Sequence, residues 1–225
     1  MIGVVLAADS DAFVWWDWVE RHYDEIWDRT VEHLQLAGTA LIIGFGLSVG
    51  LSVLALRFRR TYGPITWVAG LLYTIPSLAL FGFLLPFTGF GTTTAVIALV
   101  SYTLLILVRN FVAGVDGVPE SVREAADGMG YTPWRRFVGV DLRLATPAIV
   151  AGLRVAAVTT IGLVTVTALI GAGGYGVLIS DGLSRNFSTP IVVGATLSVA
   201  MAVFFDVVLL GIERLLTPWA RRRAR

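Results

Sequence analysis

Residues 117–147 read GVPESVREAADGMGYTPWRRFVGVDLRLATP, and they are the longest polar stretch between two long apolar runs. The flanking runs, residues 92–115 (interrupted by Arg109) and 147–170, approach or exceed the roughly 20 residues of helix that cross a bilayer core. Of the 225 residues in the chain, 56% are hydrophobic and only 15% are charged. Because a soluble domain carries about 25% charged residues, this composition predicts a membrane protein with several spans.

The polar stretch itself has the signals of two short helices. Pro119 suits the start of the first helix, and Gly128 or Gly130 suits its end. Thr132 can cap a second helix that has Pro133 at its first position. We therefore predict a helix, a glycine turn and a second helix, held at the membrane surface.

The chain offers five spans. Four are clear from their length and apolar character, and the fifth is short unless it continues past Arg109 through residues 111–115. The spans are residues 34–56, 64–86, 92–108, 147–170 and 190–212. Backbone groups in lipid must be satisfied within the segment, and no stretch shows the alternating polarity of a barrel strand. The predicted fold class is an all-α integral membrane protein with about five transmembrane helices.

Arginine is unevenly distributed between the loops. One set of loops carries Arg57, Arg59, Arg60, Arg109, Arg123, Arg135, Arg136, Arg143, Arg214, Arg221, Arg222, Arg223 and Arg225. With Arg154 near the membrane edge, this face holds 14 of the 17 arginines. The other face holds Arg21, Arg29 and Arg185 with nine acids, Asp9, Asp11, Asp17, Glu20, Asp24, Glu25, Asp28, Glu32 and Asp181. The arginine-rich face is expected to be cytoplasmic, so the N-terminus is outside and the C-terminus inside.

These patterns divide the chain into three parts. Residues 1–30 are expected outside the membrane, 31–213 form the transmembrane domain, and 214–225 are a basic cytoplasmic tail. Aromatic residues recur at helical spacing over residues 13–36, with acids between them. This predicts an interfacial helix at the outer leaflet, in contact with lipid headgroups. A binding surface for an extracytoplasmic partner is the alternative, and the two are compatible.

The order of residues inside 117–147 resembles a known motif. Glu124-Ala125-Ala126 is followed, after three intervening residues, by Gly130 and then, after nine more intervening residues, by Val140-Asp141-Leu142. This is similar to the EAA loop of the permeases of binding-protein-dependent ABC importers. Arg143 stands where that family usually has proline, which leaves the path of the chain out of the loop open.

The resemblance implies a type I (MetI-like) transmembrane domain in a bacterial plasma membrane. In that family the loop is the coupling helix that sits in a cleft of the cytoplasmic ATPase, and Trp134 and Phe137 beside arginine also have the composition of an interface hot spot. The implied ATPase contacts are Glu124, Ala125, Ala126, Gly130, Thr132, Trp134, Arg135, Phe137 and Val140. The implied partners are a pair of ATP-binding subunits, a second permease copy or paralogue, and an extracytoplasmic substrate-binding protein.

The chain lacks a phosphate-binding loop, so ATP and Mg²⁺ are expected on the partner ATPase. We expect no enzyme activity, cofactor, metal or nucleic acid for this chain.

Three shorter segments resemble the permeases for osmoprotectants such as glycine betaine, choline, carnitine or proline betaine. They are residues 74–81, residues 151–154 leading into 160–162, and residues 170–176. A permease for another small solute, such as an amino acid, is the first alternative. An ion-coupled secondary transporter would need inverted repeats with broken helices and midplane ion ligands, and neither is found. A membrane scaffold would leave the loop motif unexplained.

Several residues are candidates for a gate or pathway. They are Pro76, Ser77, Arg154, Gly171, Gly173, Gly174 and Gly176. Pro76 favours a kink inside the second span, with Ser77 helping to satisfy freed carbonyls, in either a gating or a purely structural role. The glycines fit G-x-G-x-x-G, but they follow an apolar span and not a strand, so a tight re-entrant bend is preferred over nucleotide binding.

Charged and aromatic residues in or near the spans were the remaining candidates. Arg154 extends to the cytoplasmic interface or makes an inner-gate or subunit contact. Asp206 is expected to contact Arg154 or a partner subunit. The aromatics Trp67, Tyr73, Phe81 and Tyr102 are not expected to form a cage for a quaternary ammonium. His22 and His33 are interpreted as interfacial residues.

Overall fold

The computed structural model describes residues 14–218. The basic residues at 221–225, and the acids Asp9 and Asp11, lie outside the described residues. Within the described part every regular element is a helix, which confirms the predicted fold class. Four helical runs are long and apolar enough to cross a membrane, and a bent pair of shorter helices raises the number to as many as five.

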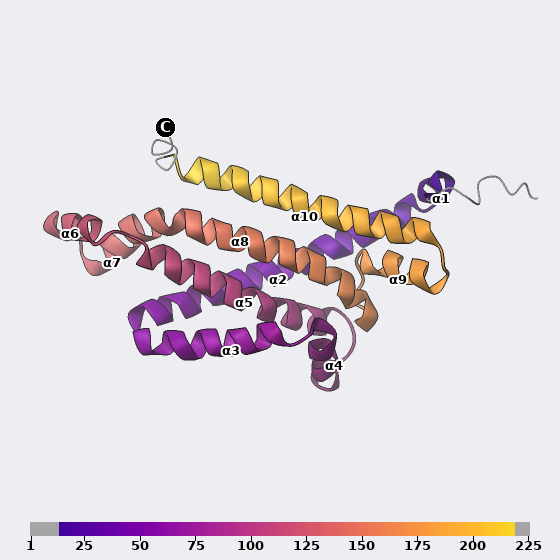
Figure 1. The fold of residues 1–225 in the computed structure, drawn as a ribbon, viewed down its shortest axis with the longest axis horizontal. Coiled ribbons are helices and arrows are strands. Elements are labelled where there is room, and N and C mark those ends of the chain that lie inside the picture. The colour runs from indigo at the N-terminus through magenta and orange to yellow at the C-terminus, as the bar shows by residue number, and fades with distance from the viewer. Residues whose placement is uncertain (1–13, 219–225) are drawn as a thin grey trace, which may run out of the picture.

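The four long runs contain the main helices. They are α2 (Tyr23–Arg57), α5 (Thr92–Asp116), α8 (Leu142–Val164) and α10 (Ser188–Leu216). The third predicted span therefore does continue past Arg109, as its apolar continuation suggested. α5 lies at the centre and packs against α2 and α8 (Figure 1). A Cβ at Gly114 would lie 2.9 Å from the Cβ of Ala148, so small side chains let α5 and α8 approach closely.

The second predicted span is not a kinked helix but two helices, α3 (Tyr62–Thr74) and α4 (Ser77–Thr88), bent by 101°. The residue before a proline is driven to extended backbone, and Ile75 has φ −66° and ψ 127°. The break frees the carbonyl of Ile75, which accepts a 2.6 Å hydrogen bond from the Tyr102 hydroxyl. Tyr102, and not Ser77, therefore satisfies the broken backbone.

The elements are sorted between two ends of an elongated molecule (Figure 1). One end, called here the loop end, holds α6 (Glu120–Gly128), α7 (Pro133–Arg136), the η1 turn (Arg59–Thr61) and the end of α10. The opposite end, called the bend end, holds α1 (Trp16–Arg21), α4 and α9 (Gly176–Ser184). The arginine-rich segments within the described residues thus share one end, as their sequence positions required.

The N-terminal aromatic segment differs from its prediction as one interfacial helix. The helix breaks at His22, and α2 then runs unbroken for 35 residues from Tyr23 into the first span. The rings of Trp15 and Trp18 lie edge-on to Phe187, with ring centroids 6.3 and 5.9 Å apart, and the backbone N–H of Trp15 donates to the Thr189 hydroxyl at 2.9 Å. These indoles fasten α1 to the start of α10, whereas Tyr23 and Trp27 remain exposed.

Candidate functional site

The polar stretch folds as its turn and capping residues predicted. Gly130 has φ +80°, a conformation that L side chains rarely adopt, and it separates α6 from α7. The Thr132 hydroxyl accepts a hydrogen bond from the Arg135 N–H at 3.3 Å, and Pro133 is the first residue of α7. The helix–glycine turn–helix prediction is confirmed.

A network of ion pairs beneath α6 and α7 was not foreseen from the sequence. The Arg123 Nε donates to Asp141 Oδ1 at 3.0 Å, and its Nη2 donates to the Val115 carbonyl at 2.6 Å. Arg136 pairs with Asp127, and its Nε lies 3.9 Å from Asp141 Oδ2. Asp141 is buried, and it joins α6 and α7 to the start of α8. The two short helices therefore form one unit with α8.

The chain leaves the loop without a break. Residues Phe137–Asp141 form one turn of π-helix that runs directly into α8, and Pro147 lies inside α8. Single π turns within helices occur frequently at functional sites. The Arg143 departure from the motif thus leaves a continuous helical path from α7 into the fourth span.

The outer surface of α6 and α7 combines exposed apolar and charged side chains. Trp134 and Met129 are each 70% exposed, and the Trp134 ring lies 5.9 Å from the half-buried Phe137 ring. The exposed members of the predicted coupling set are Glu124, Ala125, Gly130, Thr132, Trp134 and Arg135. Phe137 and Val140 are half-buried, and Ala126 is buried against the unit itself. An exposed indole beside charges is the usual content of a protein-binding hot spot.

The glycines at the bend end make a tight turn, as predicted. Gly171, Gly173 and Gly174 have φ between +72° and +92°, and they link a 3₁₀ turn, Thr165–Ile170, to α9. A Cβ at Gly176 would overlap the backbone carbonyl of Thr165. Because no strand precedes these glycines among the described residues, the context of a dinucleotide-binding loop is missing.

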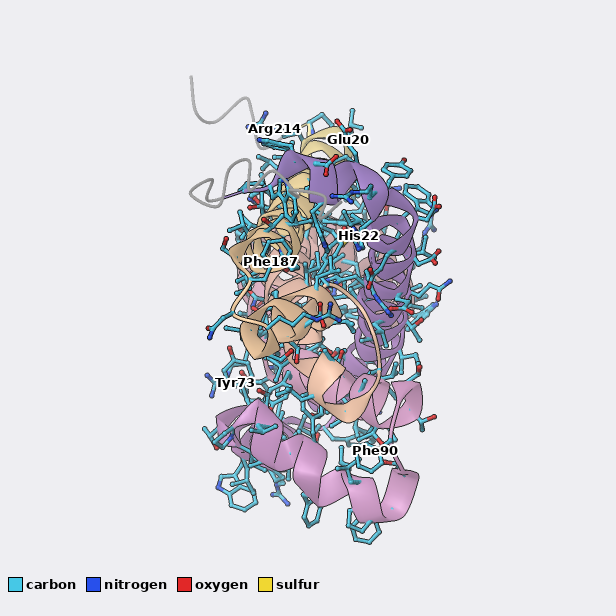
Figure 2. All side chains as sticks on the ribbon, turned by 90° about the vertical axis from the view of Figure 1, so that its right-hand side faces the viewer. Glu20, His22, Tyr73, Phe90, Phe187 and Arg214 are labelled. Carbon is cyan, nitrogen blue, oxygen red and sulfur yellow. The ribbon has the colours of Figure 1, made fainter. Side chains whose placement is uncertain are left out.

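Two residues of α2 fasten this turn to the bundle. The Gly174 N–H donates to Glu32 Oε2 at 2.9 Å, and the Tyr175 N–H donates to His33 Nδ1 at 3.2 Å. His33 Nε2 then donates to the Ile161 carbonyl at 3.0 Å. His33 is fully buried, so its assignment as an interfacial residue was wrong. His22 instead stacks on Trp18 near Phe187 (Figure 2).

The charged residues in the fourth and fifth predicted spans meet. Arg154 donates from Nε and Nη2 to the two oxygens of Asp206 at 2.9 and 3.0 Å. Its Nη1 lies 3.6 Å from Glu213 Oε2. The contact between Asp206 and Arg154 is therefore confirmed, and it ties α8 to α10.

The four span aromatics do not form a cage. Tyr73 and Tyr102 meet edge-on with ring centroids 6.1 Å apart, but Phe81 is fully buried and Trp67 is 69% exposed. In Figure 2, which faces the bend end, Tyr73 lies on the α3–α4 side, far from Phe187 and His22. A polar cavity of about 550 Å³ lies instead beside the glycine turn, lined in part by Arg29, Glu32 and Gly173.

Comparison with known proteins identifies the family of the chain. A family model described as "Binding-protein-dependent transport system inner membrane component" matches residues 42–222. The osmoprotectant import permease protein OsmW of Salmonella typhimurium is 37% identical over 194 residues, covering 84% of this chain and 90% of OsmW. The choline transport system permease protein OpuBB of Bacillus subtilis is 35% identical over 201 residues, covering 89% and 93%.

A carnitine transport permease protein, OpuCB of Listeria monocytogenes, is 37% identical over 197 residues, covering 88% of this chain and 90% of OpuCB. Among solved structures, inward facing MetNI methionine ABC transporter matches with a TM-score of 0.76 at 20% identity, covering 88% of this chain and 99% of that chain. At that identity the match shows a shared fold, and the fold is MetI-like.

Together these findings define the class of protein: a membrane-embedded permease subunit of an ABC importer, and not an ATPase. The chain belongs to the binding-protein-dependent transport system inner membrane component family, whose relatives here are bacterial membrane permeases.

Proposed function

We propose that this permease carries a quaternary ammonium osmoprotectant of the betaine, choline or carnitine class into the cell. The support is that relatives aligned with most of the chain are permeases for osmoprotectants, choline and carnitine. A separate binding protein delivers the solute from outside, and a second permease copy or paralogue completes the path. ATP and Mg²⁺ are held by two cytoplasmic ATPase subunits.

In this proposal the loop end faces the cytoplasm, so the N-terminus is outside and the C-terminus inside. The outer surface of α6 and α7 docks into the ATPase, with Glu124 facing an arginine of that subunit and Trp134 as the central apolar contact. The observation that carries the proposal is the exposure of this surface on a unit that ion pairs fix to α8. A docking helix that is fixed in this way can transmit a displacement.

The route of transmission follows the ion pairs. ATP-driven closure of the ATPase subunits moves α6 and α7, and Asp141 carries this movement into α8. The Arg154–Asp206 contact couples α8 to α10. Alternating access then results from two discrete packings of the spans, with the path open inward in one and outward in the other.

The docking surface is tested by Trp134→Ala in the complete importer, reconstituted with its ATPase and binding protein. We expect substrate-stimulated ATP hydrolysis to fall by about tenfold or more, as for a hot-spot tryptophan. Bulky replacements of Glu124 or Gly130 should abolish coupling and leave membrane insertion intact. Trp67→Ala is the matched control, because Trp67 is equally exposed but lies on α3. Equal effects of Trp134→Ala and Trp67→Ala would contradict the docking role.

The substrate class is tested separately by uptake into proteoliposomes. Choline, carnitine and glycine betaine should each be taken up in an ATP-dependent manner, and methionine should not. Uptake of methionine alone would favour the amino-acid alternative. Uptake that follows an ion gradient without ATP would favour a secondary transporter.

A further inference from the structure

The cavity beside the glycine turn has a more polar lining than the cavities at α8–α10 and at α3. Its walls come from α2, from the first residue of α5 and from the turn into α9, and its volume is about 550 Å³. This size falls within the usual range for small-molecule sites. The cavity at α3 is lined by apolar residues, and the cavity at α8–α10 is lined by apolar residues together with Ser198 and Asp206.

Opposite charges stand side by side in the wall of this cavity. Arg29 Nη1 lies 2.9 Å from Glu32 Oε2 and 3.1 Å from Glu32 Oε1. Arg29 uses only Nη1 in these bonds and its Nε is buried, whereas its Nη2 makes no hydrogen bond among the described residues. A guanidinium has five N–H donors arranged as a fork. This one therefore retains donors for a further acceptor.

Uncharged polar side chains complete the lining. Gln35, Thr39 and Thr92 all line the cavity, and their side chains make no hydrogen bond within the described part of the chain. Close backbone approach is also built in, because a Cβ at Gly173 would overlap the Glu32 carboxylate. The wall thus offers a cation, an anion and free hydrogen-bonding groups within a few residues of one another.

We propose that this cavity is a binding site for a small zwitterion that carries a quaternary ammonium and a carboxylate. The ammonium has no N–H to donate, so it needs a carboxylate beside it, which Glu32 supplies. The ligand carboxylate needs charge-assisted donors, which Arg29 supplies with the help of the neighbouring polar side chains. Because the Arg29–Glu32 pair is neutral as a whole, a zwitterion matches it without adding net charge.

This proposal rests on the proposed function and deepens it, because it names the residues that select between substrates of one importer. A cation without a carboxylate, such as choline, uses Glu32 alone. A zwitterion, such as carnitine, uses both charges. Arg29 therefore determines specificity for the carboxylate, and Glu32 serves both kinds of substrate.

The experiment compares maximal uptake rates of choline and carnitine by the complete importer in proteoliposomes, with the binding protein saturated by each substrate. We expect Arg29→Gln to lower the carnitine rate by about tenfold, the effect of losing a hydrogen bond to a charged group, and the choline rate by less than about twofold. Glu32→Gln keeps an oxygen that can accept from the Gly174 N–H, and it should lower both rates. Arg185→Gln removes an exposed arginine at the same end that does not line the cavity, and it should change neither rate.

Melting temperature and basal ATP hydrolysis of each variant separate loss of the site from loss of the fold. Equal loss of choline and carnitine uptake in Arg29→Gln, or no loss of either, would overturn the zwitterion site while wild-type uptake still supports the proposed function. A wild-type importer that carries neither compound would overturn the proposed function itself, and this site with it.

Discussion

At the scale of single residues, Gly176 is the glycine where an added Cβ would make the closest contact. Its missing side chain leaves room for the backbone carbonyl of Thr165, which a Cβ would overlap. Gly176→Ala must therefore displace the 3₁₀ turn before α9. We expect the melting temperature of the detergent-solubilised permease to fall by roughly 5 °C, the consequence of about 1–3 kcal/mol of overpacking.

The control for this change is Gly38→Ala in α2, where a Cβ would meet no atom within 4 Å. Alanine is a better helix former than glycine, so this variant should melt at or slightly above the wild-type temperature. If Gly176→Ala and Gly38→Ala had the same melting temperature, the 3₁₀ turn before α9 would be shown to move aside at no cost in stability.

His33 is a second residue with an exacting environment. It is buried, it accepts from the Tyr175 N–H, and it donates to the Ile161 carbonyl. His33→Phe would leave both backbone groups without partners, at about 1–3 kcal/mol for each. We expect a large drop in the yield of folded permease on gel filtration, with partial recovery in His33→Gln, whose amide can both donate and accept. Equal yields of the two variants would argue against this hydrogen-bonding role.

At the scale of elements, α8 and α10 are joined by a charged cluster in which Arg154 of α8 faces Asp206 and Glu213 of α10. Asp206→Asn removes the carboxylate that accepts both of the short Arg154 hydrogen bonds and leaves the guanidinium only its 3.6 Å contact with Glu213, and a poorly paired guanidinium is costly at membrane depth. We expect the permease to assemble less well with its partners and to melt at a lower temperature in nanodiscs. Because Glu213 also faces Arg154, the triple variant Arg154→Met with Asp206→Leu and Glu213→Leu should recover much of this loss, since replacing all three charges by apolar groups avoids an unpaired charge. Normal assembly of Asp206→Asn with lost transport would instead place Asp206 in the transport path.

The elements were also where the sequence was most informative. Long apolar runs predicted the spans, and Pro133 with Thr132 predicted α7, because these signals act between neighbouring residues. The 101° bend at Pro76 was predicted only as a kink, because a proline alone does not give the angle; the donor for the Ile75 carbonyl is the Tyr102 hydroxyl, 27 residues away in the sequence.

The candidate sites were predicted less completely for the same reason. Glu32 and His33 bind backbone N–H groups 142 residues away, and Arg123 meets an aspartate 18 residues later. No periodic pattern encodes such pairs. Glu32 and His33 were visible in the sequence as an acid and a base, but their hydrogen-bond partners are defined only by the packing of α2 against the turn into α9.

At the scale of the whole molecule, the placement of the two ends predicts a labelling pattern. The chain has no cysteine, so single cysteines can be introduced without removing others. A cysteine at Ser121, exposed on α6, should react with a membrane-impermeant maleimide only in inside-out vesicles. A cysteine at Ser184, exposed at the end of α9, should react only in intact cells or right-side-out vesicles. Labelling of Ser121→Cys from the outside would reverse the orientation and end the coupling proposal.

The length of α2 has a consequence for how solutes reach the permease. At 1.5 Å per residue its 35 residues extend roughly 52 Å, while the hydrocarbon layer is only about 30 Å thick. Even with an average tilt of about 20°, some 14 residues must stand beyond the lipid tails. The charged N-terminal part of α2 then extends beyond the hydrocarbon layer into the aqueous layer. In the proposed orientation, Arg29 and Glu32 are therefore reachable from water on the outer side, and an arriving solute meets both charges before any fatty acyl chain.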